Sequence, residues 1–271
     1  MGLVGGTQLS AQELLVAAAS DLAPAVPALT SEALKNQKLT LRVSIGSSGQ
    51  LARQIEQGAP FDLFLSADEK FTEQVIKAGR GDSATLQIYA IGRLALWSKS
   101  GTVRQLADLA NPKIKRIAMA NPAFAPYGRL AREALEKAGL WSTVEPKIIL
   151  AETVRQTMQF AGTGNVDAAL TSWTLVHDQG GILLPDSIRQ SGVVIKGSKN
   201  TAAAVEFLKF LKTSNGQGIL GRHGLLPGDP PGDPLLQELK NNEGDGKGGG
   251  ANEQAQKPKS LRPAKKRNKH E

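Results

Sequence analysis

The sequence has no cysteine and little histidine, and these absences exclude several kinds of chemistry. Its 271 residues include three histidines, His177, His223 and His270, and no two of them have the spacing of metal ligands. A sequence without cysteine offers no disulfide, thiolate metal site, cysteine nucleophile or lipid-modified cysteine. No run reaches the roughly 18–20 apolar residues of a membrane-spanning helix. We therefore expect neither a protein-bound metal nor a membrane span, and the length suits two ordinary domains or one large one.

The first residues also lack a recognisable export signal. Residues 1–6 have neither the basic start nor the long apolar run of a secretory signal peptide. We expect residues 1–12 to be a flexible N-terminus. This observation predicts either that the true start lies upstream of Met1 or that the protein stays inside the cell.

The positive charge is unevenly distributed along the chain. The formal net charge is +8, and residues 241–271 hold eight Lys or Arg against four acids, so this segment carries half of the excess. Residues 241–271 have almost no apolar side chains, and residues 233–271 are predicted to be a disordered basic tail. Such a tail is either a solvated extension or a segment that adheres to an anionic surface. The rest of the chain is only mildly basic, and we expect no nucleic-acid partner.

The body of the chain repeats a short apolar run, a tip of small residues and a segment with helical spacing. Residues 39–45 alternate apolar and polar side chains, which predicts a half-buried strand. A GSSG tip follows at residues 46–49, and helical spacing then continues to Gly58, a natural helix stop. The same reasoning predicts strands at residues 14–18, 61–65, 86–97, 116–119, 147–150, 166–171 and 193–195. Strands that alternate with helices predict an α/β fold with mostly parallel sheets.

The long strand at residues 86–97 is expected to cross between two lobes, and the chain is expected to return near residues 190–195 after an irregular stretch. This division gives one lobe from residues 13–90 plus 195–232 and another from residues 91–194. A helix is expected to follow the first strand, up to about Lys35, and Pro27 is expected to shorten or kink it.

Four tips share the same chemistry, because each places a small or hydroxyl residue where a helix begins. Ligands of open α/β sheets bind beyond the carboxyl ends of the strands, where these tips lie. The first N–H groups of a helix have no intrahelical partner and bind anions without a cationic side chain. One such serine or threonine is usually only a helix cap, so the prediction of a neutral anion site rests on all four together: Ser20-Asp21, Ser47-Ser48-Gly49, Tyr127-Gly128 and Thr153-Val154.

A site made of donors favours fully ionised dianions over protonated phosphate, whose proton would face a donor. Asp21 is the exception, since its carboxylate could accept such a proton.

Several motifs resemble the periplasmic molybdate-binding proteins of the ModA family. The resemblance runs over roughly residues 13–227 and is carried by these segments in order: AAASDLAPAV at 17–26, SSGQLARQIEQGAPFDLFLSADEKF at 47–71, NPAFAPYGRLAREALEKAGLW at 121–141, AETVRQTMQFAGTGNVDAAL at 151–170 and GSKNTAAAVEFLKFL at 197–211. It implies a type II periplasmic binding protein. Such a protein has two α/β lobes with mixed, mainly parallel sheets, joined by two crossing strands, and binds an anion in the cleft.

The resemblance also implies roles for particular residues. Ser20 and Ser48 would donate hydroxyl and backbone N–H groups to the oxyanion, and Tyr127 and Val154 would donate backbone N–H groups. Asp21 and Ser172 are weaker candidates. Asp21 stands where many relatives are neutral, and we expect its carboxylate to cap its helix while its N–H stays available.

The function implied is the capture of molybdate or tungstate and its delivery to the membrane permease of an ABC importer. Such a protein is exported to the periplasm, is expected to be a monomer, and is neither an enzyme nor dependent on a cofactor.

Three alternatives stay open. The ligand could be another tetrahedral oxyanion, namely sulfate, thiosulfate or phosphate. A hydrolase with Ser48 as nucleophile would need His177 or His223 as base, and GSSG does not match the nucleophile-elbow pattern. A ligand-sensing regulator would need a DNA-binding module, for which the sequence has no room outside its polar tail.

Overall fold

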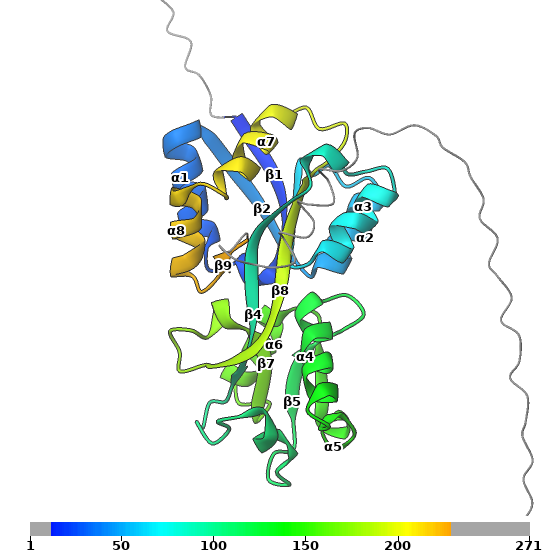
Figure 1. Cartoon of the computed structure of the whole chain (residues 1–271), viewed down its shortest axis with the longest axis vertical. Helices are drawn as coiled ribbons and strands as arrows, with labels where there is room; N and C mark the ends of the chain where they lie inside the picture. Colours follow the sequence, from blue (N-terminus) through cyan, green and yellow to red (C-terminus); the bar gives the residue numbers. More distant parts are fainter. Residues whose placement is uncertain (1–11, 229–271) are drawn as a thin grey trace, which may run out of the picture. The chain divides into compact units, whose positions relative to one another are not determined.

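Two long antiparallel strands, β4 (Gln87–Trp97) and β8 (Ile182–Val194), run through both lobes of the protein (Figure 1). A computed structural model describes residues 12–228, all within one compact unit. The predicted N-terminal segment 1–12, all but Gln12, and the predicted tail 233–271 lie outside the described residues. The architecture is the two-lobed, mixed α/β fold that the sequence predicted.

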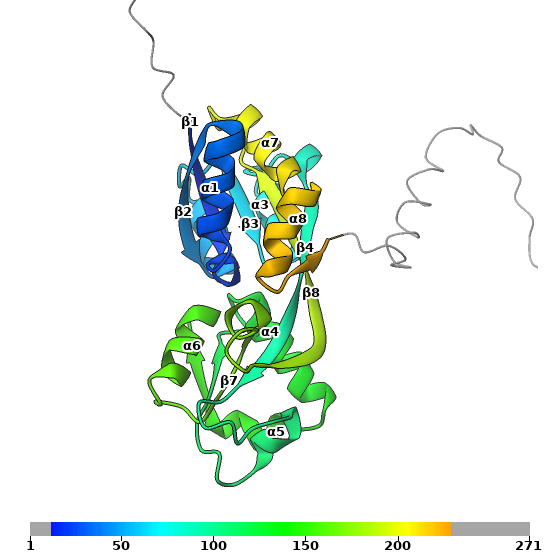
Figure 2. The ribbon, with the colours of Figure 1, turned by 90° about the vertical axis from the view of Figure 1, so that its left-hand side faces the viewer.

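The first lobe is built on β1 (Gln12–Ala19), which pairs in parallel with β2 (Leu39–Gly46) and β3 (Leu63–Ser66). Helices pack around this part of the sheet (Figure 2). They are α1 (Val26–Gln37), α2 (Ser48–Glu56), α3 (Glu69–Lys77), α7 (Thr201–Phe210) and α8 (Ser214–Arg222), with the short 3-10 helices η1 (Ser20–Leu22) and η2 (Ser83–Thr85).

The second lobe has β5 (Ile117–Ala120) in parallel between β6 (Ile148–Ala151) and β7 (Ala168–Ser172). Its helical segments are α4 (Pro126–Lys137), α5 (Trp141–Val144), α6 (Val154–Gly162), η3 (Leu106–Ala110), η4 (Glu145–Lys147) and η5 (Trp173–Leu175). A two-residue strand, β9 (Leu226–Pro227), pairs with β4.

The sheet order is β2-β1-β3-β8-β4-β7-β5-β6, with β9 beside β4. The crossing strands pair antiparallel with β3 and β7, so each lobe has a parallel part joined to an antiparallel one. In the parallel register Ala19 lies opposite Gly46, and Ala120 lies opposite Ala151. Because parallel strands end at the same edge, the tips of each lobe are side by side.

Aliphatic side chains fill the core of each lobe. Leu14, Val16 and Phe207 belong to a cluster in the first lobe, and Ile117 and Met119 belong to one in the second, all almost fully buried. The start of β2 alternates buried and exposed positions, as its sequence predicted, whereas β3, β5 and β7 are buried at every position, as parallel strands covered on both faces require. No helix among residues 12–228 combines the length and the apolar character that a membrane crossing requires.

Two sequence expectations about elements were wrong. The stretch before residue 193 was expected to be irregular, but β8 begins at Ile182 and has 13 residues. Its polar positions carry no strand signal, and pairing with β4 holds it extended. The helix expected directly after β1, shortened or kinked by Pro27, is divided into η1 and α1, and α1 begins only at Val26 with Pro27 in its first turn. A proline fits there because that N–H needs no intrahelical acceptor.

The predicted lobe boundaries fall on the crossing strands, one between residues 90 and 91 inside β4 and one at the end of β8. The exact division of the chain into lobes stays a prediction.

The start of α4 requires glycine at position 128. A Cβ added to Gly128 would overlap the carbonyl oxygen of Ala120 and reach within 3.0 Å of the carbonyl carbon of Asn121. We expect Gly128→Ala to lower the free energy of unfolding by about 3 kcal/mol or more, because backbone atoms must move to admit the methyl group. Urea unfolding measures it. Gly162→Ala is the control, since a Cβ there meets nothing within 4 Å, and an equal effect of both substitutions would contradict the explanation.

Candidate functional site

The four predicted tips line one small cavity between the lobes. The cavity has an empty volume of about 200 Å³. Ser20 and Ser48 reach it from the first lobe, and Tyr127 and Val154 reach it from the second. Its lining residues are Ala19, Ser20, Asp21, Gly46, Ser47, Ser48, Ala67, Ala125, Pro126, Tyr127 and Val154. Larger hollows lie at the surface, but none of them gathers the ends of strands from both lobes.

Two serine hydroxyls can donate into this cavity. Ser48 is buried, and its Oγ accepts a hydrogen bond from the Ala67 N–H at 3.0 Å, which leaves the hydroxyl hydrogen for another acceptor. Ser20 is 5% exposed, and its hydroxyl makes no hydrogen bond within the described residues. Both side chains therefore have a donor to offer to a ligand.

Backbone N–H groups add further donors. Ser48, Tyr127 and Val154 lie in the first turns of α2, α4 and α6, where N–H groups have no intrahelical acceptor. The Thr153 hydroxyl caps α6 by accepting from the Gln156 N–H at 3.1 Å, so the cap leaves the Val154 amide untouched. The positive ends of three helix dipoles thus meet at the cavity.

None of the lining residues is Lys, Arg or His. An anion in this cavity would be held by neutral donors and helix dipoles, as the sequence predicted, without a cationic side chain in contact.

Asp21 is the one acid that lines the cavity, and its contacts differ from those expected. Its carboxylate was predicted to cap its helix. Instead, Oδ2 accepts hydrogen bonds from the Tyr127 hydroxyl at 3.1 Å and from the Gln190 amide, whereas Oδ1 has no partner among the described residues. Burial raises the pKa of Asp21 from 3.8 to about 6, although the hydrogen bonds from Gln190 and Tyr127 act in the opposite direction.

Tyr127 serves the site through its side chain as well as its position on α4. Its hydroxyl also accepts a hydrogen bond from Gln190 Nε2 at 3.1 Å, and the Tyr89 hydroxyl donates to Gln190 Oε1 at 2.9 Å. A Cβ at Gly92 of β4 would overlap the Tyr127 hydroxyl, so glycine makes room for it. Burial raises the pKa of Tyr127 well above its usual value, with the Asp21 charge as a second cause. The hydroxyl therefore stays a neutral donor.

Ser172, a weaker candidate, does not line the cavity. It is fully buried, its hydroxyl lies 2.8 Å from that of Thr174, and it accepts from the Thr174 N–H. Thr174 in turn donates to the backbone carbonyl of Asp21 at 2.7 Å. Ser172 thus supports a contact between the lobes, and direct contact with a ligand stays a prediction that the cavity does not support.

The structure adds polar residues that sequence reasoning missed. Gln190 and Tyr89 come from the two crossing strands, and Thr174 comes from η5. Gln190 lies in the part of β8 that has no strand signal, and no motif surrounds it. The pairing of β4 with β8 brings Gln190 and Tyr89 into the polar network around Asp21.

The lobes also touch beside the cavity, next to Ser48. The Gly49 N–H donates to the Phe124 carbonyl at 2.8 Å, and a Cβ at Gly49 would come within 2.9 Å of Phe124 Cα. The Arg53 guanidinium lies 4.5 Å from the centre of the Phe124 ring. Glycine at this position allows the two lobes to approach at the level of the backbone.

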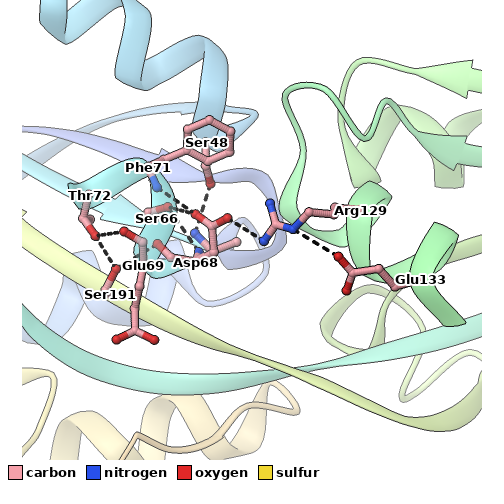
Figure 3. Close-up of polar contacts among 10 residues, drawn as sticks. Ser48, Ser66, Asp68, Glu69, Phe71, Thr72, Arg129, Glu133 and Ser191 are labelled. Carbon is pink, nitrogen blue, oxygen red and sulfur yellow. Dashed lines mark hydrogen bonds and ion pairs between the residues drawn. The ribbon is translucent and has the colours of Figure 1, made fainter. Parts of the chain in front are cut away.

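An ion pair closes the same side of the site. Figure 3 shows Arg129 of α4 against Asp68, with an Nη2–Oδ2 distance of 2.9 Å, and against Glu133 of its own helix at 3.5 Å. Asp68 is held by the Phe71 N–H at 3.2 Å, because it caps α3, and by the Ser66 hydroxyl at 3.1 Å. The lobes are therefore in contact around the cavity.

The histidines required by the hydrolase alternative lie elsewhere. His177 packs near Trp173, with ring centres 6.2 Å apart, and neither His177 nor His223 lines the cavity with Ser48. Burial, followed by the His177 charge, lowers the pKa of His223. Among the described residues, no group of three or more His, Cys, Asp or Glu could hold a metal ion.

Comparison with known proteins identifies the family. The family model of bacterial extracellular solute-binding proteins matches residues 14–226. This chain belongs to that family. The molybdate-binding protein ModA of Rhodobacter capsulatus is 33% identical to this solute-binding protein, over 83% of this chain and 94% of its own. The ModA of Azotobacter vinelandii is 30% identical, over 79% and 90%. The resemblance to the ModA family is confirmed.

Solved structures agree with the fold of this solute-binding protein. The periplasmic molybdate-binding protein of Azotobacter vinelandii superposes with a TM-score of 0.74 at 28% identity, covering 79% of this chain and 98% of its own. The sulfate-binding protein SubI of Mycobacterium tuberculosis has a TM-score of 0.71 at 18% identity, over 84% of this chain and 91% of its own, and shares the fold alone.

The raised pKa of Asp21 predicts how its replacement changes stability. The folded protein holds the proton more tightly than the unfolded chain, so stability falls as pH rises from about 4 to about 6 and the loss is complete above that range. Asp21→Asn keeps an oxygen for Tyr127 and Gln190 and has no such loss. We expect the variant to gain about 3 kcal/mol over the natural protein near pH 8 and little near pH 4. Urea unfolding of the ligand-free proteins at both pH values measures the gain, and an equal gain at both would refute this origin.

Proposed function

We propose that this solute-binding protein captures molybdate or tungstate in the interlobe cavity and delivers it to the permease of an ABC importer. The observation that carries the proposal is that strand ends from both lobes surround one small cavity with neutral donors and no cationic side chain. The names of the relatives at 30% and 33% identity support molybdate as the ligand.

The number of donors is sufficient for tight binding. Ser20 and Ser48 would each offer a hydroxyl and an N–H, and Tyr127 and Val154 would each offer an N–H. A hydrogen bond to a charged group contributes roughly 1.5–3 kcal/mol, so six would contribute about 9–18 kcal/mol before desolvation and closure subtract several. A micromolar complex needs about 8 kcal/mol net, which lies within this range.

Ligand selection would follow from charge and size. Neutral donors favour a tetrahedral dianion, and a cavity this small suits a small oxyanion better than a sugar or a peptide. Sulfate and thiosulfate have the same charge and shape, so they stay competitors. Asp21 also favours phosphate as a competing ligand, because its carboxyl group could accept the phosphate proton that a site made only of donors would reject.

Delivery would use the two crossing strands as the hinge. β4 and β8 connect the lobes, and closure on the anion would present both lobes together to the permease. The protein would act as an exported monomer in the periplasm, without a cofactor and without catalysis. The name of the Azotobacter vinelandii relative supports the periplasmic location, since that protein is called periplasmic.

Isothermal titration calorimetry of the full chain tests the proposal directly. We expect saturable 1:1 binding of molybdate and tungstate, together with a rise in melting temperature, because a ligand that binds only the native state stabilises it. Competition with sulfate and phosphate tests selectivity, and tighter binding of either would replace the proposed ligand. An unchanged melting temperature, with molybdate and with tungstate each at about 1000 times the micromolar Kd considered above, would eliminate the proposal.

Replacement of the Ser48 hydroxyl tests the site itself. Ser48→Ala removes one hydrogen bond to a charged ligand, so we expect molybdate affinity to fall by about 1–3 kcal/mol, or roughly 5- to 150-fold. Ser142→Ala is the matched control, because Ser142 is exposed and is not among the lining residues. Calorimetry measures both. Equal affinity of the two variants would show that the ligand lies elsewhere.

A further inference from the structure

Asp21 presents an unpartnered carboxylate oxygen at a cavity proposed to hold a dianion. The residue is 1% exposed, it lines the cavity, and its Oδ1 makes no hydrogen bond of normal geometry among the described residues. The backbone N–H groups of Asp21 and Leu22 lie near the carboxylate and lower its pKa, but by less than Gln190 and Tyr127 do. A buried polar atom without a partner is rare in a folded protein and requires an explanation. A bound ligand explains it if a proton lies between Oδ1 and a ligand oxygen, since both atoms are otherwise acceptors.

No positive charge faces this carboxylate from the elements packed around it. Tyr127 of α4, Gln190 of β8, Tyr89 of β4 and Thr174 of η5 surround Asp21, and the lining residues from α2 and α6 are also uncharged. An ionised Asp21 would therefore repel a dianion at short range in a poorly screened environment.

The carboxylate is also held in place. Tyr127 and Gln190 both donate to Oδ2, and Thr174 donates to the backbone carbonyl of the same residue. Turning the side chain away would break the first two hydrogen bonds and leave buried donors unpaired, which is costly. Protonation of Asp21 therefore relieves its repulsion of the dianion more readily than movement of the side chain does.

We propose that each bound oxyanion enters this site together with one proton, which Asp21 shares with it through Oδ1. The inference rests on the function proposed above and assigns Asp21 as a residue that determines both specificity and pH dependence. The protonated carboxyl group becomes one more neutral donor, so the unpartnered oxygen gains a hydrogen bond and the dianion loses a repulsive neighbour. For a fully ionised ligand the protonated form of the buffer supplies the proton and becomes its conjugate base, and no other bond is made or broken.

The sign of the pH dependence follows from the ligand-free state. Burial raises the pKa of Asp21 to about 6 in the free protein, so above that pH the group is mostly ionised and must take up a proton on binding. Affinity should then fall by up to about tenfold per pH unit above pH 6 and level off below it. A neutral residue at position 21 should abolish this dependence.

Calorimetric titration of the full chain with sodium molybdate tests the proposal. Titrations near pH 7.5 in two buffers of different ionisation enthalpy count the protons taken up, and we expect nearly one per molybdate for the natural protein. Affinity should fall about 100-fold between pH 6 and pH 8.5. Asp21→Asn should take up none and bind with an affinity that varies less than about threefold over this range. Asp178→Asn is the control, because Asp178 is exposed and absent from the cavity lining, and it should behave like the natural protein.

The outcomes separate the two proposals. Molybdate binding without proton uptake by the natural protein overturns the shared proton and leaves the proposed function standing. The same holds if Asp21→Asn keeps the full pH dependence. Absence of molybdate binding at every pH by both proteins overturns the proposed function itself. Should Asp21→Asn fail to fold, the buffer comparison on the natural protein decides alone.

Discussion

The antiparallel pairing of β4 with β8 is the interaction on which the rest of the structure depends. It connects the lobes, and its register places Ala90 opposite Gln190 and Gly92 opposite Ile188. As a result, Gln190 donates a hydrogen bond to the Tyr127 hydroxyl, and Gly92 leaves the space that this hydroxyl occupies. The strands that would act as a hinge therefore also build one wall of the polar network behind the cavity. A change in their register would disturb the lobe contact and the site together.

How much the sequence could predict depends on whether the information was local. The tips at Ser20, Ser48, Tyr127 and Val154 were found because a strand, a small residue and a helix start are adjacent in the chain, and parallel strands end at one edge. That they share a cavity needed only the α/β topology. β8 and Gln190 could not be predicted in this way, since partner strands hold β8 extended and its own side chains give no apolar period. The contact of Asp21 with Tyr127 joins residues 106 positions apart.

Asp21 is not the residue that selection for stability alone would place at this position. A buried carboxylate without a cation, and with one oxygen unpaired, costs free energy in the ligand-free protein. An asparagine would satisfy Tyr127 and Gln190 equally well. Violations of local rules concentrate at functional sites, where the cost is offset by an interaction made with the ligand. The carboxyl group differs from an amide in one relevant property, since it can gain or lose a proton with the ligand.

The contacts beside the cavity indicate what must hold the lobes closed. The ion pair of Arg129 with Asp68 is the strongest charged contact between them, yet the Arg129 side chain is 30% exposed, and partly exposed pairs contribute little net stability. The hydrogen bond from Gly49 to Phe124 adds about 1 kcal/mol at most. These contacts define the closed geometry without fixing it strongly. Donors from both lobes, however, would converge on one oxyanion, and a ligand bridging them would contribute several hydrogen bonds that exist only on closure. The closed conformation would then be the ligand-bound one. A partner that contacts both lobes at once could therefore distinguish the loaded protein from the empty one.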